Sequence, residues 1–193
     1  MGSGRSGLYS GTHGSSEITK ASDINGNIAE DASSRASKTH DFSTDLYHAS
    51  KTLQSHIENA ETASSGSSGI KGAHNKNNFL REVNRIGAKA IASTPNSQID
   101  GVEQIRYKMP KKDKYGKPTG DLKAQSFKKT VYDPSKIGTD KYIERGLQAA
   151  NNSARKSESG KLGREWSGID NQNVKWHGYC DQNGNIISFY PED

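Results

Sequence analysis

The amino-acid sequence predicts an α+β fold in which helices pack on antiparallel β-hairpins, and two kinds of periodicity support this prediction. Apolar residues recur at helical spacing in three stretches: residues 41–63, 78–91 and 140–153. Strand-like runs separated by turn residues form two pairs: 101–109 with 126–132, and 173–180 with 185–190. After residue 68 the order is helix, hairpin, helix, hairpin, which is typical of a small α+β domain.

The composition divides the chain in two. Only 30% of the 193 residues are hydrophobic, so the apolar residues must be concentrated to form a core. Residues 1–40 are mostly Gly, Ser, Thr, Asn and Asp, which is typical of a flexible linker, and a second Gly/Ser break occurs at 64–68. We therefore expect a linker or leading segment at 1–68, with one helix at 41–63, and a domain at 69–193.

Each expected helix has an apolar face, and two have a candidate N-cap. Ser43 or Thr44 is available to cap the first helix, and Thr139 to cap the third. The apolar faces are, in chain order, Leu46, Leu53 and Ile57; Phe79, Val83, Ile86 and Ala90; and Tyr142, Ile143, Leu147 and Ala150.

The two hairpins differ in their connections. The first has a long, strongly basic connection at 110–120, and its second strand stops at Asp133 and Pro134. The second turns at Asn183 and Gly184, the strongest short hairpin signal.

The positive charge is concentrated in the predicted domain. Residues 1–68 have 5 Lys/Arg against 8 Asp/Glu, a net charge of −3, whereas residues 69–193 have 22 against 14, a net charge of +8. Such an excess suits a polyanion, because each neutralised phosphate releases counterions. No apolar run is long enough to span a bilayer, and we expect no cofactor and no metal, since the domain lacks an Asp, Glu and His cluster with metal-ligand spacing. Cys180 is expected to be a core or strand residue.

His74 is the strongest candidate for acid–base chemistry on a phosphodiester. Cleaving RNA without a metal needs a base for the 2′-hydroxyl and an acid for the departing 5′-oxygen, and the pKa of histidine suits both. His74 lies in a Gly-containing loop just before an expected helix start, where backbone N–H groups favour a phosphate. The alternative is a surface loop histidine. Lys71, in the same loop, either contacts phosphate or is only solvated.

Three stretches point to a known family: SGIKGAHN at 68–75 followed by Phe79, KTVYDP at 129–134, and GNIISFYP at 184–191. Together they resemble the bacterial branch of the EndoU endoribonucleases, the C-terminal toxin domains of contact-dependent inhibition and other polymorphic toxins. The resemblance implies metal-independent cleavage of RNA, with tRNA the expected substrate, by 2′-hydroxyl transesterification that leaves a 2′,3′-cyclic phosphate. It further implies a cognate immunity protein, a monomer, secretion within a larger parent toxin and action in the cytoplasm of a target bacterium.

The resemblance also implies roles for particular residues. Eukaryotic and nidoviral relatives use two histidines and a lysine, with a Ser/Thr-x-Tyr element on a late strand. His74 matches one histidine, Lys129 matches the lysine, and Ser188 with Tyr190 matches the late element, whose spacing puts both side chains on one face. Lys129 would stabilise the phosphorane, and Thr130 beside it is a candidate substrate contact.

The second histidine of that pattern has no match between Asn75 and Trp176. His177 is the candidate second acid or base, with Tyr190 or a lysine as alternatives. Strand alternation puts His177 opposite Trp176, facing solvent or a cleft, with solvent favoured. The histidines before residue 69 are expected to be inert linker or helix-face residues: His13, His40, His48 and His56.

Other classes of function remain as alternatives. A non-catalytic nucleic-acid-binding or adaptor module would equally explain the basic charge and aromatic strands. A metal-dependent DNase is disfavoured by the absence of metal-ligand spacing. A serine or cysteine hydrolase is disfavoured because the sequence has neither a Gly-x-Ser-x-Gly elbow nor a Cys/His constellation.

Overall fold

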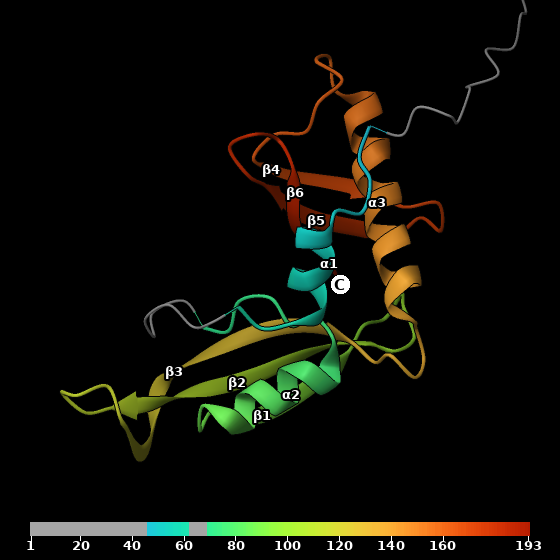
Figure 1. Cartoon of the computed structure of the whole chain (residues 1–193). Coiled ribbons are helices and arrows are strands. Elements are labelled where there is room, and N and C mark those ends of the chain that lie inside the picture. The colour runs from blue at the N-terminus through green and yellow to red at the C-terminus, as the bar shows by residue number, and fades with distance from the viewer. Residues whose placement is uncertain (1–45, 62–68) are drawn as a thin grey trace, which may run out of the picture. The chain divides into compact units, whose positions relative to one another are not determined.

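The computed structural model describes residues 46–61 and 69–193, so the expected linker at 1–40, the N-cap candidates Ser43 and Thr44 and the break at 64–68 lie outside the described residues. The described ranges contain three helices and two three-stranded antiparallel sheets, which confirms the α+β prediction. The elements are α1 (Lys51–Glu58), α2 (Lys76–Arg85), β1 (Lys89–Pro95), β2 (Val102–Lys112), β3 (Pro118–Tyr132), α3 (Thr139–Lys156), β4 (Glu165–Ile169), β5 (Lys175–Cys180) and β6 (Ile186–Pro191). Figure 1 shows α2 along the β1–β3 sheet, α3 beside the β4–β6 sheet, and α1 between them.

Helix α1 is shorter than the expected 41–63 and belongs to the folded core. It begins after Ser50, whose side chain accepts a hydrogen bond from the backbone N–H of Leu53, so the capping signal lies later than expected. Leu46 lies outside the helix and is 55% exposed. Leu53 and Ile57 are fully buried in the same core as α3 and the β4–β6 sheet. The Gly/Ser break therefore does not separate this helix from the rest of the folded unit.

The expected helix at 78–91 is too long, because α2 ends at Arg85 and the residues from Lys89 onward form strand β1. Helix α2 ends at Arg85, and Gly87 follows with a φ of 74°, a left-handed conformation typical of a residue just after a helix. Phe79 and Val83 are buried as expected. Ala90, however, lies in the new strand and is exposed, so β1 turns the first hairpin into a three-stranded sheet in the order β1-β2-β3.

The β1–β3 sheet has one covered face. Its strands extend further than expected, which shortens the connection between β2 and β3 from 110–120 to 113–117. Strand alternation turns every second residue of β2 toward α2. The resulting cluster contains Ile70, Ala73, Phe79, Val83, Ile105, Tyr107, Met109 and Val131.

The β4–β6 sheet packs against α3, in the order β4-β5-β6. Gly138, and not Thr139, occupies the N-cap of α3, because the Thr139 hydroxyl instead makes a 2.8 Å hydrogen bond with that of Tyr132. Strand β4 was not expected, whereas the turn at Gly184 is present with a φ of 83°. Cys180 is 3% exposed, as expected of a core residue, and no helix in the described part of the chain has the length and apolarity needed to cross a membrane.

Candidate active site

The backbone of His74 is held between the end of α1 and the end of β3. Its N–H donates to the carbonyl of Ile57 at 2.7 Å, and its carbonyl accepts from the N–H of Tyr132 at 2.8 Å. Two residues earlier, Gly72 has a φ of 63°, and a Cβ there would collide with the backbone carbonyl of Asn59. A glycine at this position therefore allows the loop to lie directly against α1, which fixes His74 beside that helix.

The side chain of His74 is buried, and its hydrogen bonds define which nitrogen has the proton. The residue is only 3% exposed, so it is not the surface loop histidine of the alternative interpretation. Nδ1 lies 2.9 Å from the carbonyl oxygen of Thr130. Because a carbonyl can only accept, Nδ1 is the protonated nitrogen and Nε2 has the lone pair. Burial, followed by the charges of Lys129 and His56, holds the pKa of His74 well below its usual value.

Two of the other expected site residues meet His74 at this nitrogen. Lys129 Nζ, from β3, and Ser188 Oγ, from β6, each lie 3.4 Å from His74 Nε2. Burial lowers the pKa of Lys129 to about 8, although the carboxylate of Glu61 opposes the change. The site therefore draws one side chain from each sheet to a histidine on a connecting loop.

Tyr190 and Thr130 line a pocket of about 450 Å³, whose lining does not include His74, Lys129 or Ser188. Gln104 and Glu192 are among the other residues that line it. Tyr190 is two residues after Ser188 on the same strand, as the Ser-x-Tyr spacing predicts. Burial, together with the neighbouring Tyr179 hydroxyl, raises the pKa of Tyr190 to about 12, so it remains a hydrogen-bond donor at neutral pH.

His56, which the sequence predicts to be an inert linker or helix-face residue, lies beside His74 in the structure. Its ring centroid lies 5.8 Å from that of His74, and its Nδ1 is 2.6 Å from Glu61 Oε1. Burial lowers the pKa of His56, and the hydrogen bond and charge of Glu61 oppose this change. The sequence does contain a signal for the partial burial of His56. It is adjacent to Ile57 and three residues after Leu53, so it borders the buried face of α1.

His177 lies elsewhere on the β4–β6 sheet. It faces away from Trp176 as expected, but its side chain is only 16% exposed, so the favoured solvent orientation is wrong. Its Nε2 lies 2.9 Å from Glu165 Oε1, and its ring lies 5.5 Å from that of Tyr190. Among the described residues no hydrogen bond or ring contact joins His177 to His74, and His177 lies next to Tyr190 instead.

The remaining candidates are peripheral. Lys71 is exposed, and its backbone carbonyl accepts a 3.0 Å hydrogen bond from the N–H of Glu61, which places it near His56. His48 is exposed, and His13 and His40 lie outside the described residues. Across residues 46–61 and 69–193, no group of three or more His, Cys, Asp or Glu side chains could hold a metal ion.

Tyr142, a buried residue of α3, lies next to His74. Its ring stacks on Tyr132 at 4.5 Å and lies 6.5 Å from the ring of His74. The Tyr142 hydroxyl is buried and has no hydrogen-bond partner among the described residues. Burial, followed by the nearby tyrosines, raises the pKa of Tyr142 well above its usual value, so this group is neutral beneath His74.

Comparisons with known proteins identify the family of this chain. A family model described as bacterial EndoU nuclease matches residues 50–193, a range that includes all of α1. The chain is 35% identical over 128 residues to a protein of Escherichia coli (strain STEC_O31) and 30% identical over 124 residues to one of Yersinia mollaretii, each named tRNA nuclease CdiA. Each alignment covers 64% of this chain but only 4% of the relative, so the chain corresponds to a small part of much longer proteins.

Proposed function

Because this chain belongs to the family of bacterial EndoU nucleases, we propose that it is an interbacterial toxin domain that cleaves RNA without a metal. In the proposed reaction the 2′-oxygen attacks the adjacent phosphorus and the bond from phosphorus to the 5′-oxygen breaks. The products are a 2′,3′-cyclic phosphate and a 5′-hydroxyl. The observation that best supports this proposal is the buried, neutral His74, whose Nε2 lone pair faces Lys129 and Ser188.

His74 is the proposed general base. Its Nδ1 proton is held by the Thr130 carbonyl, so Nε2 is available to take the proton of the 2′-hydroxyl. Burial lowers the pKa of His74 and so favours its neutral form. A buried base that is already neutral needs no prior loss of a proton before it acts.

His56 is the proposed general acid, in place of His177. Burial lowers the pKa of His56, and Glu61, which accepts from Nδ1, opposes this change; in its protonated form the ring can donate from Nε2 to the departing 5′-oxygen. In this proposal His56 takes the place of the second histidine in the family pattern. His177 remains a candidate only for contact with a flanking nucleotide, through its position beside Tyr190.

Lys129 and Ser188 are the proposed stabilisers of the transition state. An ammonium group next to the reacting centre offsets the negative charge of the phosphorane, and its partial burial strengthens this effect. Ser188 Oγ, 3.4 Å from the base, is placed to donate to a phosphate oxygen or a base edge. Tyr190 offers a ring for stacking on a nucleobase, and Thr130 a hydroxyl at the same pocket.

We propose tRNA as the substrate, because both relatives are named tRNA nucleases. Their length relative to this chain supports its origin in a larger parent toxin, with action in the cytoplasm of a target bacterium. A dedicated immunity protein would then protect the producing cell. The fold, with its core closed within residues 46–193, is compatible with a monomer.

The test is cleavage of purified tRNA and total RNA by the full chain in the presence of EDTA, followed by analysis of the fragment ends. We expect 2′,3′-cyclic phosphate ends and a loss of about 10²- to 10⁴-fold in rate for His74→Ala, the range for a missing acid or base. His48→Ala is the matched control, because His48 is exposed and outside the site, and it should cleave normally.

Two outcomes would contradict the proposal. Intact RNA with the unmodified protein would exclude a nuclease of this kind. If His74→Ala retained both RNA affinity and toxicity, the chain would act as a binding or adaptor module. Circular dichroism of His74→Ala separates loss of chemistry from loss of fold.

A further inference from the structure

The face of the β1–β3 sheet that points away from α2 is strongly basic. Strand alternation in β2 turns Ile105 and Tyr107 toward α2, so Arg106 and Lys108 point to the opposite face. Lys128 and Lys89 lie on that same face, because they pair directly with Arg106 and Lys108. We call these four residues the outer basic face: Lys89, Arg106, Lys108 and Lys128.

The cations of the outer basic face lie opposite one another across neighbouring strands. Lys89 pairs with Lys108, and Arg106 pairs with Lys128. Like charges directly opposite in a sheet are destabilising. Among the described residues no carboxylate lies within ion-pairing distance of any of the four. The arrangement opposes folding stability, and a bound polyanion would relieve the repulsion.

The outer basic face continues in both directions. Toward the active site, Lys128 lines the pocket that also contains Thr130, Gln104 and Tyr190. In the other direction the β2–β3 hairpin extends beyond the end of α2, as Figure 1 shows. Its tip is exposed and has four lysines, which we call the tip lysines: Lys111, Lys112, Lys114 and Lys117.

This basic surface is longer than a dinucleotide substrate. From Arg106 to Lys112 the strand advances six residues, about 20 Å at roughly 3.4 Å per residue. Stacked nucleotides advance about 3.4 Å each along a strand of a duplex, so about 20 Å corresponds to about six of them. A dinucleotide bound at His74 would therefore not reach the tip lysines, whereas a folded RNA would.

We propose that the outer basic face and the tip lysines bind the sugar–phosphate backbone of the RNA away from the cleaved bond, so that the domain selects long, structured RNA over short fragments. This inference rests on the proposed nuclease function. RNA is favoured over an acidic protein because this surface reaches Lys128, which is next to Lys129 of the proposed active site in β3 and which lines the same pocket as Thr130 and Tyr190. The contacts are electrostatic and so supply affinity without reading sequence.

The test is a triple variant, Lys89→Gln, Arg106→Gln and Lys108→Gln, assayed on tRNA and on a ribodinucleotide that contains the bond cut in that tRNA. We expect kcat/KM for tRNA to fall about 10- to 100-fold, mainly through KM, and the dinucleotide rate to stay within about 2-fold. The slope of log affinity for tRNA against log salt should fall by about 2 to 3, since each lost phosphate contact removes about 0.7 to 0.9.

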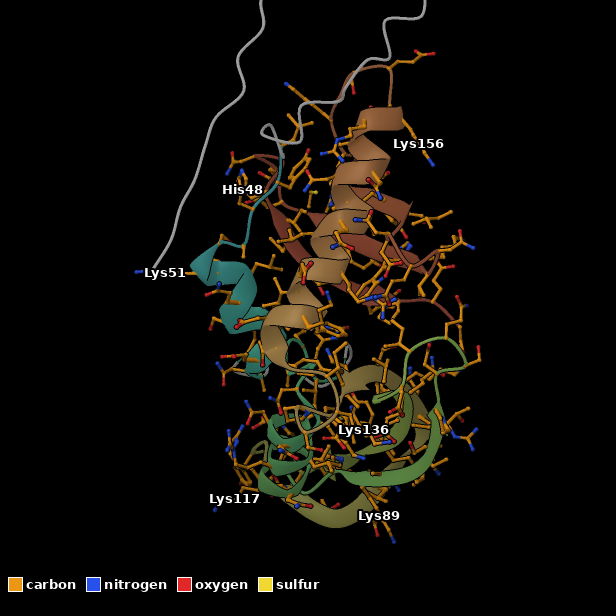
Figure 2. All side chains as sticks on the ribbon, turned by 90° about the vertical axis from the view of Figure 1, so that its right-hand side faces the viewer. His48, Lys51, Lys89, Lys117, Lys136 and Lys156 are labelled. Atoms are coloured by element: carbon orange, nitrogen blue, oxygen red, sulfur yellow. The ribbon has the colours of Figure 1, made fainter. Side chains whose placement is uncertain are left out.

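The matched control also removes two lysines and one arginine: Lys156→Gln, Lys161→Gln and Arg164→Gln. Figure 2 shows Lys89 with the β1–β3 sheet and Lys156 at the end of α3, well away from that sheet. The control variant should match the unmodified protein on both substrates. The melting temperature of the test variant should not fall, because the substitutions remove like-charge repulsion.

Three results would overturn the inference. They are unchanged tRNA cleavage by the test variant, an equal loss on both substrates, and an equal loss of binding to tRNA and to a polyglutamate probe, which would indicate a general site for acidic partners. If the unmodified protein cleaves neither substrate, the proposed function fails instead. The inference is then decided by tRNA affinity alone, measured with and without the triple substitution.

Discussion

The two sheets of this domain are used in different ways. The β4–β6 sheet buries large aromatic side chains against α3, including Trp166, Trp176 and Phe189. The β1–β3 sheet has only the short helix α2 on one face, and its other face is exposed and basic. We infer from this difference that the β4–β6 sheet mainly supplies stability, whereas the β1–β3 sheet has the exposed basic face that we propose binds RNA.

The candidate active site lies where the two sheets meet. Ser188 and Tyr190 come from the β4–β6 sheet, and Lys129 comes from the β1–β3 sheet. His56 and His74 come from α1 and the loop that follows it. Substitutions on the two sides should therefore have separable effects on stability and on chemistry.

The largest effect should come from the buried ion pair of the β4–β6 side. Arg145 is 5% exposed, and its Nε donates to Asp170 Oδ2 at 2.7 Å. Burial raises the pKa of Asp170, but hydrogen bonds from Arg145, Val174 and Trp176 outweigh this and lower it. Arg145→Met leaves that carboxylate buried without its cation and should reduce the free energy of unfolding by about 3–5 kcal/mol.

Urea denaturation measures this loss, with Arg81→Met as the control on the other side of the molecule. Arg81 is exposed on α2, so its substitution should change stability by less than about 0.5 kcal/mol. A loss below about 1 kcal/mol for Arg145→Met would mean that the β4–β6 side is not the stabilising half.

Lys129 should set the alkaline limit of activity from the β1–β3 side. Its ammonium loses its proton above a pKa of about 8, whereas an ordinary lysine stays charged to about 10. If His56 is the acid, log kcat/KM should fall with a slope of about −1 above the pKa of His56 and steepen to about −2 above pH 8. Lys129→Arg keeps its charge and should remove the second break, at a cost of about 10-fold in rate. The same steepening in Lys129→Arg would exclude this role.

Glu61 should influence the reaction through His56, and its substitution should change the rate less than the substitution of Lys129 does. Glu61→Gln removes a carboxylate that raises the pKa of both His56 and Lys129, so the alkaline fall in kcat/KM should move to lower pH. At neutral pH the rate should drop a few-fold and recover on acidification. Glu58→Gln is the control, because Glu58 lies in α1 with His56 but makes no hydrogen bond to it through its side chain in the described part of the chain. A uniform loss at every pH would indicate a structural effect instead.

The smallest effect should come from Tyr142→Phe. The hydroxyl that this substitution removes is buried without a hydrogen-bond partner in the described part of the chain, so its loss should leave the free energy of unfolding unchanged or raise it by up to about 1 kcal/mol. Thermal denaturation measures this change. A clear destabilisation would contradict this expectation and show that the Tyr142 hydroxyl makes a stabilising hydrogen bond.

Local chemistry made much of the site predictable. As predicted, His74 lies in a glycine-containing loop directly before a helix, α2. The two-residue spacing of Ser188 and Tyr190 in β6 puts both side chains on the same face of the strand. The turn at Gly184 and the burial of Trp176 also follow from short-range pattern.

The unpredicted parts depend on tertiary contacts. Strand β1 was obscured because Phe79, Val83, Ile86 and Ala90 have helical spacing, and Gly87 was the one signal that interrupts it. The role of His56 was hidden because the Gly/Ser break looks like a domain boundary. Hydrogen bonds between residues 71–75 and residues 57–61 bring the chain back across that break, and the sequence does not show them.

The distances along the chain between the site residues indicate the order in which their contacts form during folding. The two histidines are close in sequence, whereas the contact of His74 with Lys129 spans 55 residues and that with Ser188 spans 114. Closing a longer loop costs more entropy, so the histidine pair is the easiest part to form and the Ser188 contact the hardest. A partly folded chain can therefore have both histidines in place and still lack Ser188. Enzymatic activity should thus report on completion of the whole fold, and not on formation of its histidine pair.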